Sequence, residues 1–250
     1  YNAFFCAQLR ELLSNYGPIA EVWFDGACGE GPNGKRQEYD WDSYYALVRQ
    51  LQPEAAIAIC GPDVRWVGNE SGLARDDEWS VVAGPRGQGE RGVDFLEVDN
   101  GANDLGSRDN LAESEVSFWY PAECDVSIRP GWFYHASQDL QVKSLEHLLD
   151  IYYRSVGRNS VLLLNVPPDQ RGLFHENDVA RLKELRAVLD ATFGEDVARL
   201  AQGGSAAVDG AGDTHWPAQS DIDVLTLDLG AEKTVDRLLL QEAIEEGQRV

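Results

Sequence analysis

The sequence contains no methionine, and only four of its 250 residues are lysine. It also lacks any run of roughly 18 or more apolar residues, the length that marks a transmembrane helix, so no membrane partner is expected. Its first residues show neither the basic segment nor the small-residue cleavage site of a signal peptide. A chain without methionine does not start at its own initiator, so we expect a piece of a longer protein.

Positive charge is scarce as well. Lysine and arginine total 21 against 43 acidic residues, which gives a formal net charge of -22. Nucleic-acid binding needs a basic surface, so this class of function is excluded. No dinucleotide or phosphate-binding glycine motif occurs, and no cysteine pair has metal-ligand spacing, so neither a metal nor another cofactor is expected. The cysteines are expected to be ordinary small buried residues: Cys6, Cys28, Cys60 and Cys124.

The chain does contain alternating helix and buried-strand patterns. Helical spacing of apolar residues predicts helices over 4–16, 42–51, 144–156 and 176–193. Asp40 or Asp42 is expected to cap the second helix, and His175 or Asn177 the last. Near-continuous apolar runs predict strands over 19–24, 55–60 and 160–166, and another strand ends within 125–132. This order is typical of an α/β fold with a parallel sheet.

Two further regions have a different character. Residues 63–122 form a long, polar, glycine-rich connection with short apolar patches, and such connections are usually functional. Beyond Gly203, residues 223–230 alternate polar and apolar side chains, and 235–244 resemble a partner strand. We therefore expect two domains, an α/β domain over 1–202 and the beginning of an all-β module over 203–250.

Three strand ends carry tryptophan, arginine and carboxylate side chains. They are Asp25 after the first strand, residues 61–72 after the second, and residues 127–135. Polar groups at the carboxyl ends of parallel barrel strands form active sites, and tryptophan faces stack on sugars. Two carboxyl groups at such a site can divide the work of glycoside cleavage. The alternative for Asp25-Gly26 is a simple turn.

These segments match a family. The sequences EVWFDGA (21–27), RWVGNESG (65–72), PAECDVSIRPGWFYH (121–135) and GRNSVLLLNVPPDQRGLFHE (157–176) resemble the α-L-fucosidases of glycoside hydrolase family 29. The resemblance covers most of residues 1–200 and leans toward the branch that acts on α-1,3- and α-1,4-linked fucose. Residues 225–250 resemble the opening of that branch's β-sandwich, a galactose-binding-like module.

The resemblance implies a (β/α) TIM-like barrel, here partial because the N-terminal strands are missing. It implies retaining hydrolysis of terminal α-L-fucosides on fucosylated oligosaccharides or glycoconjugates, in a secreted or periplasmic protein, without a cofactor. Asp25 falls at the nucleophile position and Glu70 at that of the acid/base. A neighbour such as Trp66 is expected to raise the pKa of Glu70.

Further roles follow from the same resemblance, with alternatives left open. Substrate contacts are implied for Trp23, Arg65, Trp66, Trp132 and His135. Arg65 could instead pair with an acid, and Trp132 could belong to the core. A non-catalytic carbohydrate-binding protein on a degenerate or incomplete barrel is the rival function. Other acids compete with Glu70 for the acid/base role: Asp63, Asp76, Asp77, Glu78 and Glu123.

Overall fold

The computed structural model describes all residues except 27–30, 85–96, 221 and 245–250. Ala27, Cys28 and the last residues of the predicted β-module therefore lie outside the described part. The chain divides into two compact units. The first comprises Tyr1–Trp132 and Leu149–Pro167, and the second comprises Phe133–Leu148 and Pro168–Val250.

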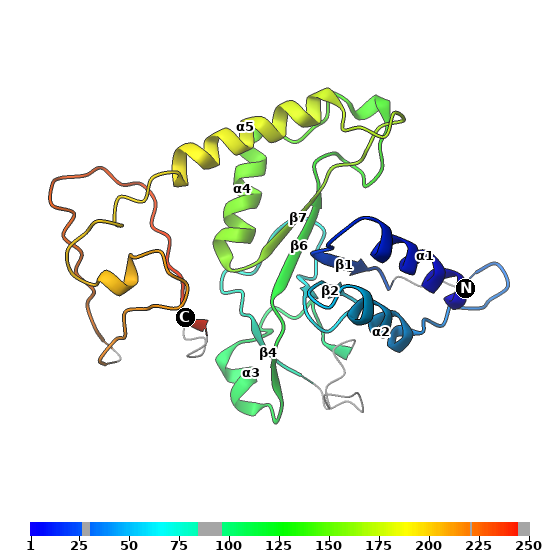
Figure 1. Ribbon diagram of the computed structural model, residues 1–250, viewed down its shortest axis with the longest axis horizontal. Helices are drawn as coiled ribbons and strands as arrows, with labels where there is room; N and C mark the ends of the chain where they lie inside the picture. The colour runs from blue at the N-terminus through cyan, green and yellow to red at the C-terminus, as the bar shows by residue number, and fades with distance from the viewer. Residues whose placement is uncertain (27–30, 85–96, 221, 245–250) are drawn as a thin grey trace. The chain divides into compact units, whose positions relative to one another are not determined.

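The first unit is built on parallel strands (Figure 1). Strand β1 pairs with β2, and β6 pairs with β3 on one side and β7 on the other, all in parallel. A parallel bridge between Ala58 and Val64 joins these two sheets, so the strand order is β1-β2-β3-β6-β7. The predicted α/β class is confirmed. The bounds are β1 Glu21–Phe24, β2 Ala56–Ile59, β3 Arg65–Trp66, β6 Ala122–Ser127 and β7 Val161–Asn165.

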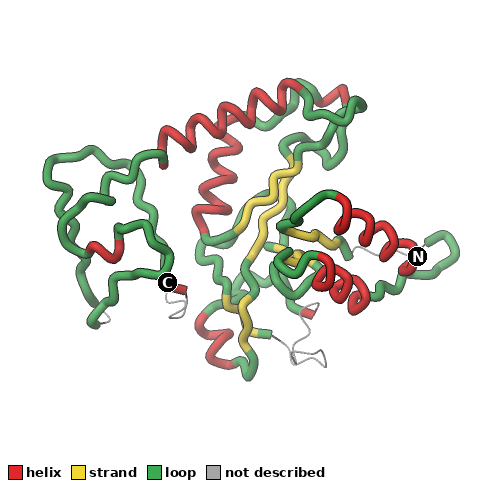
Figure 2. The backbone as a smooth tube through the Cα atoms, viewed as in Figure 1, coloured by secondary structure: helices red, strands yellow, loops and turns green. Residues whose placement is uncertain are grey.

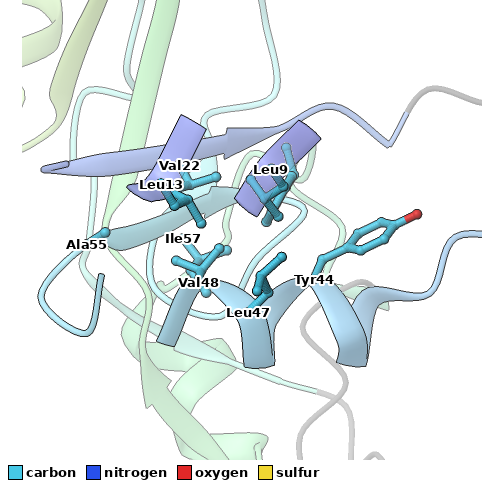
Figure 3. Packing of buried hydrophobic residues seen from close by; sticks show 9 residues of the cluster. Leu9, Leu13, Val22, Tyr44, Leu47, Val48, Ala55 and Ile57 are labelled. Atoms are coloured by element: carbon cyan, nitrogen blue, oxygen red, sulfur yellow. The ribbon is translucent and has the colours of Figure 1, made fainter. Parts of the chain in front are cut away.

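Two helices cover one face of β1 and β2. Helix α1 (Asn2–Asn15) and helix α2 (Trp41–Leu51) follow the predicted periodicity, and the Asp40 side chain caps α2 by accepting from Ser43 N at 3.2 Å. Figure 3 shows the leucines of α1 and the apolar side chains of α2 directed toward the two strands. Each such burial contributes about 1.5–3 kcal/mol. The cluster comprises Leu9, Leu13, Val22, Phe24, Tyr44, Leu47, Val48, Ala55 and Ile57.

The long connection contains structure that the sequence pattern did not predict. Strand β4 (Val81–Ala83) pairs antiparallel with β5 (Ser117–Trp119), and α3 (Arg108–Glu113) lies between them in sequence. The short apolar patches noted above become these strands. They pack on a small core of Val82, Val98, Leu105 and Tyr120.

The second unit contains helix α5 (Glu176–Phe193), which the sequence predicts with the same bounds. The Nδ1 atom of His175 caps it by accepting from Asn177 N at 3.2 Å. Helix α4 (Leu145–Ser155) begins in this unit and continues into the first. No described helix combines the length and apolar character needed to cross a membrane.

The strands predicted over 223–230 and 235–244 are wrong for the described residues. Past Gly203 the described chain is mostly irregular (Figure 2), with a 3₁₀ turn η4 (Ser205–Ala207) and an isolated bridge between Gln202 and Asp228. Leu238 and Leu240 are 82% and 80% exposed. Their apolar side chains have no sheet to pack on, and a strand forms only where a partner satisfies its backbone. The boundary near Gly203 stays a prediction.

Candidate active site

Asp25 stands at the carboxyl end of β1, on the side of the sheet opposite the helix core. Side chains alternate along a strand, so Val22 and Phe24 point into the core while Glu21, Trp23 and Asp25 share the other face. Asp25 is exposed, and Trp23 is 36% exposed. The face that carries the predicted nucleophile is therefore open.

Gly26 brings this strand end close to the end of β2. A Cβ atom at position 26 would lie 2.5 Å from the Sγ atom of Cys60, a distance that real structures do not show. The backbone N–H of Cys60 also donates to the Phe24 carbonyl at 3.2 Å. Burial raises the pKa of the Cys60 thiol, and the negative charge of Asp25 raises it further. The close approach needs glycine, which gives the Asp-Gly pair a role beyond that of a simple turn.

Strand β6 supplies two acids to the open face. All six of its residues are buried. Ala122 and Cys124 pack on the outer side in a cluster with Val67 and Ala74. The residues between them, Glu123, Asp125 and Ser127, therefore share the opposite face of the strand. Burial of the Glu123 and Asp125 carboxyl groups costs free energy unless hydrogen bonds satisfy them.

Each of the three predicted tryptophans donates its indole N–H to a carboxyl group. The pairs link different parts of the sheet, because donor and acceptor come from different strands or from the loops that follow them. Trp23 Nε1 lies 2.9 Å from Glu123 Oε1, Trp66 Nε1 lies 2.7 Å from Asp125 Oδ1, and Trp132 Nε1 lies 3.4 Å from Glu70 Oε2.

The charges show that the acids of three strand ends lie near one another. Burial raises the pKa of Asp125, and the negative charges of Glu70 and Asp25 raise it further, while the hydrogen bond from Trp66 lowers it. Both predicted catalytic carboxylates thus act on the same buried acid. Asp25 and Glu70 therefore both lie within electrostatic range of Asp125.

Glu123 lies deeper in the sheet than Asp125, two residues before it on β6. It is completely buried, and its pKa is raised to about 8. Burial is the main cause, and Glu21 adds to it through charge repulsion and a hydrogen bond, whereas the Trp23 hydrogen bond opposes it. These effects together favour the neutral form of Glu123. Its depth favours Glu70, which is exposed, as the acid that a substrate reaches.

Arg65 occupies the interior instead of an open pocket. It is completely buried and forms an ion pair with the equally buried Glu78. Its Nε donates to the Tyr120 carbonyl at 2.9 Å and its Nη2 to the Trp79 carbonyl at 2.8 Å. Glu78 also accepts from Arg75 Nη1 at 3.1 Å. This geometry favours a structural role for Arg65 over the predicted sugar contact, which stays a prediction.

Two other competing acids are also engaged by arginines. Asp63 Oδ1 accepts from Arg49 at 2.6 Å, and Asp63 Oδ2 accepts from the backbone N–H of Ile57 at 2.8 Å, so this side chain holds the turn after β2. Asp76 pairs with Arg158 at 2.6 Å. Asp76 is itself exposed, at 89% of its side chain. Glu78 lies in the interior, so Glu70 and Asp77 are the exposed acids of the competing set for which the described residues show no ion pair with an arginine.

Trp132 sits on a loop anchored to the end of β6. The Ser127 hydroxyl donates to the Gly131 carbonyl at 2.7 Å, and Asn165 Nδ2 donates both to that hydroxyl and to the Trp132 carbonyl at 3.0 Å. The Trp132 side chain is half-buried and reaches Glu70. Trp132 therefore lies beside Glu70, the predicted acid/base, and not in the core. The indole of Trp66, which the sequence predicts as the neighbour of Glu70, donates its hydrogen bond to Asp125 instead.

His135 belongs to the second unit, so its predicted substrate contact stays a prediction. In that unit it lines a polar hollow of about 460 Å³ with Tyr134, Arg171 and His175. The described residues contain no group of three or more potential metal ligands from histidine, cysteine, aspartate and glutamate.

Sequence reasoning did not single out Asp125 or Asn165. A signal was present, because residues 122–127 alternate small or apolar side chains with glutamate, aspartate and serine, which is the period of a strand with one polar face. A continuous apolar run is the usual sign of a strand buried on both faces, and residues 122–127 contain none.

Comparison with known proteins identifies relatives. The sequence model of a family described as Alpha-L-fucosidase matches residues 1–192. Alpha-L-fucosidase 1 of Arabidopsis thaliana is 38% identical over 268 residues, covering 100% of this chain and 50% of the relative. Putative alpha-L-fucosidase 1 of Oryza sativa subsp. japonica is 38% identical over 269 residues, with 100% and 48% covered. The chain spans about half the length of these curated relatives.

Solved structures show the same likeness. A putative alpha-L-fucosidase from Bacteroides ovatus is 54% identical with a TM-score of 0.72, over 82% of this chain and 36% of that one. The structure of SpGH29 is 36% identical with a TM-score of 0.74, over 93% and 52%. A Ruminococcus gnavus GH29 fucosidase in complex with fucose is 27% identical with a TM-score of 0.68, over 86% and 46%.

Proposed function

The chain belongs to the α-L-fucosidase family, and we propose that the protein hydrolyses terminal α-L-fucosyl linkages of oligosaccharides or glycoconjugates with retention. We also propose that its five parallel strands form one side of a (β/α) barrel. The open face supports this, since Val161 and Leu163 of β7 are 47% and 37% exposed there. Apolar side chains on a parallel sheet are normally covered on both faces.

The observation that supports the proposal is that Asp25 and Glu70 both raise the pKa of the buried Asp125 by their charge. Retaining glycosidases need two carboxyl groups on opposite sides of the scissile bond, about 5–5.5 Å apart. Here the two acids follow different strands, and the negative charge of each raises the pKa of Asp125. Each also lies near an indole ring: Trp23 precedes Asp25 on the same face, and Trp132 contacts Glu70.

In this mechanism the Asp25 carboxylate attacks the anomeric carbon of fucose while Glu70 donates its proton to the leaving oxygen. The result is a covalent fucosyl-enzyme. Glu70, now a carboxylate, takes a proton from water, which attacks the same carbon and releases fucose and Asp25. Two displacements at one carbon restore its configuration.

The substrate class follows from the family and the open aromatic face. An indole face stacks on the C–H side of a sugar ring, while carboxyl groups bind hydroxyls. We assign this part to Trp23, Trp66 and Trp132, and we propose that α-1,3- and α-1,4-linked fucose is preferred. A panel of fucosylated oligosaccharides that differ only in linkage tests the preference.

Variants of the full protein test the catalytic roles. Asp25→Asn is expected to lower kcat by roughly 10³-fold or more, because amides are poor nucleophiles. Glu70→Gln should lower the hydrolysis rate of oligosaccharides far more than that of aryl fucosides, because the aryl leaving groups need no proton. Asp77→Asn, an exposed acid of the same loop, is the matched control and should leave turnover unchanged.

The stereochemistry of the first product tests the reaction itself. NMR of a fresh reaction should show α-fucose before mutarotation. Normal turnover by Asp25→Asn, or β-fucose as the first product, contradicts the proposed mechanism. Fucose binding by calorimetry without any hydrolysis contradicts the enzymatic function and supports the carbohydrate-binding alternative.

A further inference from the structure

Glu123 is completely buried, and its only hydrogen-bond donor among the described side chains is the indole of Trp23. We propose that Glu123 is a positioning residue, which holds the Trp23 indole and through it the strand end that carries Asp25. This inference rests on the proposed function and adds to it a residue that does not touch the substrate.

The contact between the two side chains spans the inner face of the sheet. Strands β2 and β3 lie between β1 and β6, and three steps of about 4.8 Å along a flat sheet separate the outer strands by roughly 14 Å. The side chains still meet at 2.9 Å, so the sheet must curve toward this face. Ala58, the neighbour of Trp23 in register, carries only a methyl group and leaves room for the indole.

The hydrogen bond therefore links strands that do not pair with each other. Trp23 lies two residues before Asp25 on the same face of β1. A hydrogen bond that holds the indole therefore restrains the orientation of the end of β1, and with it the position of Asp25. The close approach of Gly26 to Cys60 restrains the turn that follows. A misplacement of about 1 Å costs roughly 10²-fold in rate, so a group that holds this strand end bears on turnover.

The charge state of Glu123 suits such a role. Burial raises its pKa to about 8, and so do the neighbouring Glu21 and Asp125. Its Oε1 accepts the indole N–H, and no donor among the described residues reaches its Oε2. The hydrogen bond with Glu21 favours the protonated form of Glu123, which can donate to the Glu21 carboxylate. A neutral carboxyl group accepts the Trp23 indole N–H without adding another negative charge beside Glu21 and Asp125.

Three variants of the full protein test the inference. Glu123→Gln keeps the acceptor for Trp23 and a donor toward Glu21, so kcat/KM should stay within about threefold of the original. Glu123→Met keeps the volume but removes the acceptor, and should lower kcat roughly tenfold or more. Val126→Ala, a buried residue on the outer face of the same strand, is the control for lost stability and should leave kcat unchanged.

A double variant shows whether Glu123 acts through Trp23. In the Trp23→Phe background, which has no indole N–H, Glu123→Met should change kcat/KM by less than about threefold. Equal activity of the Gln and Met variants, or an undiminished effect of Met in this background, overturns the inference. If Glu123→Met does not fold, normal kcat in Trp23→Phe still overturns the inference, because that variant removes the indole N–H that Glu123 accepts.

The proposed function is judged separately by Asp25→Asn. An inactive Asp25→Asn together with indistinguishable Glu123 variants refutes the positioning role and leaves the hydrolase assignment intact. An active Asp25→Asn refutes the hydrolase mechanism whatever the Glu123 variants do.

Discussion

The ion pair between Arg65 and Glu78 makes a quantitative prediction about the interior of the first unit. Both side chains are fully buried, and Glu78 also accepts from the Arg75 backbone N–H at 3.0 Å. Burial lowers the pKa of Arg65, and the charge and hydrogen bond of the Glu78 carboxylate oppose this change, so Glu78 is the partner that compensates the buried guanidinium. Glu78→Gln removes one charge and preserves the shape of the side chain.

Loss of one partner leaves a buried charge uncompensated, which costs about 3–5 kcal/mol. For a chain of this size each kcal/mol lowers the melting temperature by roughly 2–4 °C, so we expect a fall of about 6–20 °C. Urea unfolding followed by tryptophan fluorescence and by circular dichroism measures the free energy of unfolding in parallel.

Glu184→Gln is the matched control for this prediction. Glu184 forms an ion pair with Arg181 at 2.6 Å, but its side chain is 51% exposed, so its loss should cost less than about 0.5 kcal/mol. A Glu78→Gln protein as stable as the Glu184→Gln protein refutes the structural role given to Arg65. In that case a direct contact between Arg65 and substrate becomes the better explanation of this arginine.

Two further predictions concern the sheet that carries the site. Folded Glu123 keeps its proton to about pH 8 while an unfolded glutamate loses it near pH 4.5, so folding stability should fall as pH rises through this window, by at most roughly 1.4 kcal/mol per pH unit. Glu123→Gln should remove this slope, and parallel stability curves for the two proteins between pH 5 and 8 contradict the raised pKa. Gly26→Ala should cost about 1–3 kcal/mol because its Cβ meets Cys60 Sγ, and Cys60→Ala should recover part of that loss in the double variant. An equal cost with and without the thiol shows that contact with Cys60 is not the reason for glycine.

Local patterns predicted the elements whose signal is contained in one segment. The periodicity of residues 4–16 and 176–193 gave α1 and α5, and the apolar runs gave β1, β2 and β7 to within about two residues. The caps at Asp40 and His175 were among the expected alternatives because capping depends on residues next to the helix.

Elements that depend on distant partners could not be predicted in this way. Strand β3 is two residues long and exists because β6 pairs with it, and β4 and β5 join segments more than 30 residues apart. The alternation of residues 223–230 predicts a strand, but the described residues contain no neighbouring strand with which it could pair. A sequence pattern does not show whether such a pairing strand is present.

The site shows the same division. The position of Asp25 after an apolar run is a local signal, and so is the run of tryptophans and acids after the strands. Which indole meets which carboxyl group is decided by register: Trp66 lies opposite Glu123 on β6, and its indole reaches Asp125, two residues further along that strand. The interior position of Arg65 also follows from register, because Arg65 and Trp66 point to opposite faces of one short strand.

The central claim is that Asp25 is the nucleophile of a retaining fucosidase, and covalent trapping tests it most directly. A 2-deoxy-2-fluoro-fucosyl fluoride slows hydrolysis of the fucosyl-enzyme more than its formation, so the intermediate accumulates and its peptide can be identified by mass spectrometry. We predict a single fluorofucosyl label on Asp25, lost in Asp25→Asn. A label on Glu70, Glu123 or Asp125 contradicts the account. Full turnover of a natural substrate by the Asp25→Asn variant contradicts it as well.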